Sequence, residues 1–151
     1  MAELRLPQDY QDLLQEFQQA QVEFLLIGGW AVAAHGHGRA TDDIDLLVRP
    51  SADNAKRVYE ALQRFGAPLQ GVDAGLFEAE RYGYRIGRKP LLIEILTAID
   101  GVDFDEAAAE AITVDANGLM IPVIGKGALI KNKRAAGRAK DLADVQALDG
   151  D

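Results

Sequence analysis

A glycine pair at the end of one apolar run and an aspartate pair at the start of another constrain this chain most. Gly28 and Gly29 follow the apolar segment 22–27, and thirteen residues separate them from Asp43-Ile44-Asp45. We predict a short buried strand over 22–27 and a helix over 30–35, where the composition is typical of a helix. A strand, a glycine turn, a helix and a second strand in this order predict an α/β arrangement.

The second apolar run predicts two carboxylates on one face of a strand. Residues 43–48 are rich in Ile, Leu and Val and end before Arg49-Pro50, which is typical of a strand. Side chains alternate along a strand, so Asp43 and Asp45 share a face. Two such carboxylates are costly unless they are solvated, protonated or paired with a cation. The pattern leaves two interpretations open, an exposed acidic edge or a site for Mg²⁺, which prefers oxygen ligands.

The glycine pair favours the second interpretation. Glycines at a strand-to-helix turn let backbone N–H groups approach an anion closely. Alone, Gly28-Gly29 is equally consistent with a tight turn that binds nothing. Followed at this spacing by Asp43 and Asp45, the pair predicts phosphate next to a metal.

A third acid lies inside a later apolar run. Glu94 is the one charged residue of segment 91–97, and a carboxylate in such a run needs a partner. If this segment pairs with 43–48, Glu94 completes a set of three metal ligands. The alternative is a carboxylate that faces solvent or an arginine such as Arg85.

The rest of the chain predicts helices and hairpins without repeats. Pro7 is suited to the first turn of a helix, Ser51 to the N-cap of a helix that ends near Gly66, and Asn117-Gly118 to a hairpin turn. The further predicted elements are a hairpin over 80–97, a helix over 104–111, and helices over about 126–136 and 140–148.

Basic residues cluster near the C-terminus of an otherwise acidic chain. The cluster comprises Lys131, Lys133, Arg134, Arg138 and Lys140. Lysine and arginine neutralise the charge of a nucleoside triphosphate in many sites. A solvated helix face is the alternative interpretation of such a cluster.

These motifs together resemble the nucleotidyltransferase superfamily related to DNA polymerase β. The segments 28–32, 39–47 and 132–145 resemble, more narrowly, small bacterial members: AbiEii-like toxins of type IV toxin–antitoxin systems and small antibiotic nucleotidyltransferases. The resemblance extends from about residue 22 to the C-terminus. It departs from the family pattern at Trp30, where many members have serine, and at Glu94, where aspartate is more usual.

The resemblance implies a fold, a division of the chain and a set of functional residues. The implied fold is α/β (α+β) with a mixed central sheet flanked by helices. The implied division is a single minimal nucleotidyltransferase domain over 1–151, with a catalytic core over 22–125 and a helical tail over 126–151. The catalytic and metal-binding residues are Asp43, Asp45 and Glu94, with Mg²⁺ or Mn²⁺; the nucleotide-binding residues are Gly28, Gly29, Arg39, Thr41 and Lys133. Arg39 and Thr41 have the alternative of orienting Asp43 or bonding to the backbone.

The implied activity is transfer of a nucleoside monophosphate from a triphosphate such as ATP to a hydroxyl of RNA, a protein or a small molecule. The toxin of a toxin–antitoxin system is one such role, and an antitoxin or a second copy of the chain is the expected partner. A non-catalytic nucleotide- or partner-binding module of the same fold is the alternative, favoured by the two departures.

Composition limits the partners. The net charge of −8 argues against a broad nucleic-acid surface, and the absence of cysteine excludes disulfides and thiolate metal sites. No apolar run is long enough for a membrane span and no signal segment opens the chain. We therefore expect a cytoplasmic protein that does not bind membranes.

Overall fold

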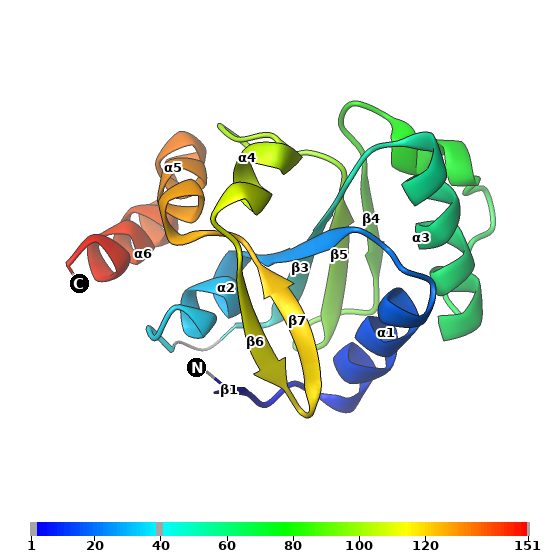
Figure 1. The fold of residues 1–151 in the computed structure, drawn as a ribbon, viewed down its shortest axis with the longest axis horizontal. Coiled ribbons are helices and arrows are strands. Elements are labelled where there is room, and N and C mark those ends of the chain that lie inside the picture. The colour runs from blue at the N-terminus through cyan, green and yellow to red at the C-terminus, as the bar shows by residue number, and fades with distance from the viewer. Residues whose placement is uncertain (1–2, 39–40, 151) are drawn as a thin grey trace.

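Seven strands form one mixed sheet in the computed structural model, which describes residues 3–38 and 41–150 (Figure 1). The elements in chain order are β1 (Glu3–Leu4), α1 (Gln8–Gln19), β2 (Phe24–Ile27), α2 (Gly28–Ala34), β3 (Asp43–Val48), α3 (Ala52–Phe65), the 3₁₀ helix η1 (Ala74–Glu78), β4 (Gly83–Ile86), β5 (Leu92–Leu96), α4 (Phe104–Ala109), β6 (Ile112–Ala116), β7 (Leu119–Val123), α5 (Lys126–Ala136) and α6 (Ala139–Asp149).

The strand order is β1-β6-β7-β2-β3-β5-β4. β3 runs parallel to β5 and antiparallel to β2, and β4 is the antiparallel edge strand beside β5. α1 and α3 lie together at one end of the molecule, and α5 and α6 lie at the other (Figure 1). The predicted mixed sheet with flanking helices is thereby confirmed.

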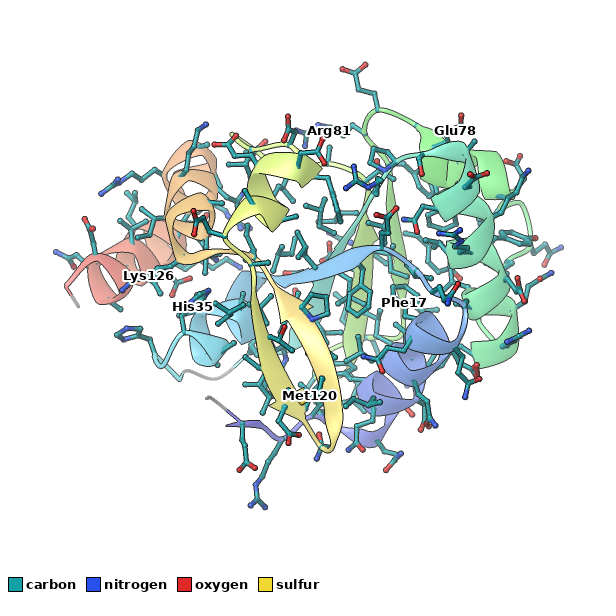
Figure 2. All side chains as sticks on the ribbon, viewed as in Figure 1. Phe17, His35, Glu78, Arg81, Met120 and Lys126 are labelled. Atoms are coloured by element: carbon teal, nitrogen blue, oxygen red, sulfur yellow. The ribbon has the colours of Figure 1, made fainter. Side chains whose placement is uncertain are left out.

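The two faces of the central strands differ in chemistry. Ile44 and Leu46 of β3 are fully buried and pair across the sheet with Ile93 and Ile95 of β5. α1 covers this apolar face, and Phe17 points from it into the interior (Figure 2), where its ring lies 5.3 Å from that of Phe24 on β2. The opposite face of β3 and β5 carries the acids.

The structure corrects several predicted boundaries. The first long strand begins at Phe24, because the amide of Val22 donates to the carbonyl of Phe17 at the end of α1 instead of pairing in the sheet. α2 begins at Gly28 rather than at residue 30, and α4 ends at Ala109 rather than at residue 111. The sequence did not predict β1 or η1, because two and five residues are too few to establish a periodicity.

No helix in the described ranges is long and apolar enough to cross a membrane.

Candidate active site

Three carboxylates meet on one face of β3 and β5. The two strands are parallel neighbours, and their register places Asp45 directly beside Glu94. Asp43 lies two residues before Asp45 and therefore on the same face. One carboxylate oxygen from each of the three lies within 4.8 Å of the others, so the group could hold a metal ion. The structure thus brings together the three acids that the sequence predicted as metal ligands.

The environment of Asp45 disfavours its ionised carboxylate. Burial, and after it the charges of Asp43 and Glu94, raises the pKa of Asp45 to about 7, against an ordinary value of 3.8. The positive charges of Lys133 and Lys140 oppose this rise. Oδ1 of Asp45 is buried without a hydrogen-bond partner among the described residues. A buried oxygen that has no partner among the described residues and lies beside two further carboxylates could coordinate a cation, so the donor set fits a divalent cation.

The absence of a side chain at Gly28 leaves space for the carboxylate of Asp45. The φ of Gly28, +69°, is a left-handed conformation, which glycine adopts at little cost. A Cβ at this position would overlap Oδ2 of Asp45. Two requirements, backbone conformation and close approach, therefore select glycine here. Gly28 and Gly29 both line the cavity above the acids, as a phosphate-binding turn requires, and their contact with phosphate stays a prediction.

Thr41 orients the first aspartate. Its hydroxyl lies 3.1 Å from the carbonyl oxygen of Asp43 and 3.2 Å from Oδ1 of the same residue, and can donate to either. These contacts fit the alternative roles of Thr41, orienting Asp43 or bonding to the backbone; Thr41 also lines the cavity, and its contact with a nucleotide stays a prediction. Arg39, predicted with it, lies outside the described residues.

The acids form the floor of a charged cavity of about 630 Å³. Cations from two parts of the chain line it together with the acids. The lining cations are Arg81, Arg85 and Lys89 around β4, and Lys133, Arg138 and Lys140 on α5 and at the start of α6.

Lys133 is held inside the protein by two carboxylates. Its side chain is 5% exposed, and Nζ lies 3.2 Å from Oδ1 of Asp141 and 3.0 Å from Oδ2 of Asp144. Burial would raise the pKa of Asp141, but hydrogen bonds from Arg138 and Lys133 outweigh it and lower that pKa below its ordinary value. Lys133 therefore fastens α5 to α6 as well as lining the cavity, and its predicted contact with a triphosphate stays a prediction.

Arg138 and Lys140 are the more accessible cations of this region. The side chain of Arg138 is 63% exposed while its Nε donates to Asp141 at 2.7 Å. Both residues belong to the basic cluster seen in the sequence, but its spacing alone did not distinguish them from Lys133. The cluster divides into a buried anchor and exposed cations only because α6 turns back against α5.

Glu94 has two partners rather than one. It belongs to the acid cluster, and its Oε1 also lies 3.4 Å from Nη2 of Arg85, the residue opposite it on β4. The structure thus places Glu94 in the acid cluster and also beside Arg85, the arginine that the sequence offered as its alternative partner; its binding of a metal stays a prediction. Arg81 and Lys89, by contrast, were not predicted, because no motif marks them.

Two further residues lie apart from the acids. Trp30 is absent from the cavity lining; it packs against the core, and its Nε1 is buried without a hydrogen-bond partner among the described residues. Nε2 of His35 lies 2.8 Å from the carbonyl oxygen of Ile124, beside α2 (Figure 2).

The fold is similar to that of a known adenylyltransferase. The crystal structure of the lincosamide antibiotic adenylyltransferase LnuA, with lincomycin bound, matches this chain with a TM-score of 0.58 and 15% sequence identity, over 97% of this chain and 98% of that one. No protein-family model and no curated protein sequence matches the chain. The similarity, together with the mixed sheet that carries the acids, shows that this chain has the nucleotidyltransferase fold.

Proposed function

We propose that this protein transfers a nucleoside monophosphate from a nucleoside triphosphate to a hydroxyl group of a small molecule. The observation that carries the proposal is the acid cluster: Asp43, Asp45 and Glu94 converge on one point, with an unpartnered Asp45 oxygen and Gly28 pressed against it. This arrangement lies on a nucleotidyltransferase fold.

The three acids would hold Mg²⁺, or Mn²⁺ in its place. A divalent cation bound there would neutralise charge on the triphosphate and lower the pKa of the attacking hydroxyl. It would also offset the burial and the carboxylate repulsion that together raise the pKa of Asp45.

The remaining residues would bind the triphosphate, orient Asp43 and accept a proton. The backbone of Gly28 and Gly29 would contact the β- and γ-phosphates, and the exposed cations Arg138 and Lys140 would neutralise them. Thr41 holds Asp43 in position. The acceptor hydroxyl oxygen attacks the α-phosphorus and forms the new O–P bond, its proton passes to the Glu94 carboxylate, and the bond to pyrophosphate breaks.

A small acceptor is favoured over a macromolecular one for three reasons. The cavity of about 630 Å³ has the size of a small-molecule site, and LnuA, the structural neighbour, is an antibiotic adenylyltransferase. A net charge of −8 also opposes tight binding of a polynucleotide. The role of an AbiEii-like toxin, with an antitoxin or homodimer as partner, stays a prediction from the sequence resemblance.

The test is calorimetric titration of each ribonucleoside triphosphate with Mg²⁺, followed by a transfer assay with an α-labelled triphosphate and a panel of hydroxyl acceptors. The variant is Asp43→Asn/Asp45→Asn, and the matched control is Asp53→Asn, an exposed aspartate in the first turn of α3. We expect magnesium-dependent binding and transfer that only the double variant loses. Binding without transfer to any acceptor would favour the non-catalytic nucleotide-binding module, and equal binding by the double variant would refute the site.

A further inference from the structure

The edge of the sheet brings a second group of cations to the cavity. Arg85 on β4, Arg81 just before this strand and Lys89 in the turn after it all line the cavity; we call these three residues the cationic wall. Arg81 lies at the upper rim of the molecule (Figure 2). Gly83 stands between the two arginines along the chain, and the side chain of Leu96 on β5 packs against it.

The wall and the glycine turn lie on opposite sides of the acids. Gly28 follows β2, the acids lie on β3 and β5, and Arg85 lies on β4, in the strand order β2-β3-β5-β4. Three strand spacings, about 14 Å, separate β2 from β4. In phosphoryl transfer the attacking and leaving oxygens are roughly in line on opposite sides of the phosphorus. If pyrophosphate leaves toward Gly28, the acceptor therefore enters from the side of β4.

The exposed arginines are able to change partners. Arg85 is 69% exposed and lies 3.4 Å from Glu94, and Arg81 is 65% exposed and lies 3.3 Å from Asp100. Both guanidinium groups are largely solvated, although Glu94 itself is only 15% exposed, so an arginine can exchange its carboxylate for another anion at little cost. The planar guanidinium group binds phosphate or carboxylate through two parallel hydrogen bonds.

We propose that the cationic wall binds an anionic group of the acceptor, which is then a small hydroxylated molecule carrying a phosphate or a carboxylate. This inference rests on the proposed nucleotidyl transfer and adds the chemical class of the acceptor. A cationic acceptor would have to displace Arg85 and Arg81 from Glu94 and Asp100 to gain carboxylate partners on this side, and is disfavoured. Because Arg85 stands beside Glu94, the anionic group lies close to the reacting hydroxyl in the bound acceptor.

The test separates the wall from the triphosphate site. We would saturate the wild-type protein with Mg²⁺ and a non-hydrolysable α,β-methylene ATP, and then titrate inorganic phosphate, ribose 5-phosphate and ribose by calorimetry. The same titrations follow for Arg81→Gln/Arg85→Gln. The matched control is Arg64→Gln, since Arg64 is an exposed arginine, 50% accessible, paired with Glu60 on α3.

We expect ribose 5-phosphate to bind at least about tenfold more tightly than ribose, because a hydrogen bond to a charged group contributes about 1.5–3 kcal/mol. The double variant should lose this preference and its affinity for inorganic phosphate, while it keeps its affinity for the ATP analogue. The Arg64→Gln protein should behave like the wild type throughout.

Four results would overturn the inference. If the double variant loses the ATP analogue as well, the arginines bind the triphosphate. If the wild type binds ribose as tightly as ribose 5-phosphate and does not bind inorganic phosphate, the cationic wall recognises no anion. In that case normal binding of the ATP analogue would leave the proposed function intact. If a single-stranded oligoribonucleotide binds far more tightly than any small anion, the acceptor is a polynucleotide. Failure of the wild type to bind the analogue rejects the wall and the proposed function together.

Discussion

Replacing Asp45 with asparagine should stabilise the metal-free protein while it abolishes nucleotidyl transfer. The pKa of Asp45 rises from 3.8 to about 7 on folding, with burial as the largest cause. Each unit of pKa difference corresponds to about 1.4 kcal/mol, so the ionised carboxylate destabilises the folded state by about 4 kcal/mol once the pH exceeds both values.

The pH dependence gives this prediction its sign. Between 3.8 and about 7 the unfolded chain has lost the Asp45 proton while the folded protein keeps it. The folded state therefore binds more protons, and the free energy of unfolding falls as the pH rises through this window. From about pH 5 to about pH 8 the wild type should lose about 2.5 kcal/mol through this group alone. The asparagine of the Asp45→Asn variant cannot ionise, so this variant should escape the loss.

Urea unfolding in EDTA at about pH 5 and about pH 8 measures the effect. An amide in a buried position without a partner carries a cost of about 1–3 kcal/mol, but this cost is the same at both pH values. The stability of Asp45→Asn relative to the wild type should therefore increase by about 2.5 kcal/mol from the lower to the higher pH. Asp53→Asn, at an exposed position, should show no such increase.

Magnesium should reduce the stability advantage of the variant at the higher pH. A cation at tenfold its dissociation constant stabilises the folded wild type by about 1.4 kcal/mol, and Asp45→Asn should gain much less. A stability difference that stays constant within about 0.5 kcal/mol between the two pH values would refute the reasoning, because Asp45 would then not be the repelled carboxylate that the structure shows.

Three other changes test separate parts of the site. Gly28→Ala should lower the free energy of unfolding by about 2 kcal/mol or more and abolish triphosphate binding, because its Cβ would overlap Asp45. Gly36→Ala, with a φ of +97° and open space around it, should lower it only by the conformational strain of about 1 kcal/mol. Thermal unfolding compares the two variants. Lys133→Met should lower the free energy of unfolding by about 3–5 kcal/mol, since it removes the buried cation that faces Asp141 and Asp144, while Lys131→Met, at a 56% exposed position, should stay within about 0.5 kcal/mol in urea unfolding. Tyr10 on α1 supports β5, because its hydroxyl donates to the backbone carbonyl of Leu92 at 3.1 Å. Tyr10→Phe should therefore lower the free energy of unfolding by about 1 kcal/mol in the same urea measurement.

The sequence predicted the floor of the cavity because local periodicity determines it. Strand alternation put Asp43 and Asp45 on one face, and an apolar run with a single charge identified Glu94. The pairing of β3 with β5 was an assumption at that stage, since parallel neighbours are joined by long connections and their register leaves no short-range signal. The structure supplies that register and with it the contact between Asp45 and Glu94.

The walls of the cavity could not be predicted in the same way. Arg81 and Arg85 reach the site because β4 lies at the sheet edge beside β5, which depends on tertiary pairing. Lys133 and Arg138 differ in exposure because α6 folds back on α5, so that Asp141 accepts hydrogen bonds from both. Charge clusters in a sequence show where cations gather but not which of them the fold buries.

The two halves of the site differ in whether their buried charged groups have partners of opposite charge among the described residues. Around Lys133 each buried charge faces an opposite one at about 3 Å, as expected of a rigid support. Around Asp45 the chain instead places an unpartnered oxygen, two further carboxylates and a left-handed glycine at one point. Departures from local stability rules are expected at functional sites. A divalent cation bound to these acids, as proposed, would offset the repulsion of Asp45 by Asp43 and Glu94, whereas the ion pairs of Lys133 hold α5 against α6.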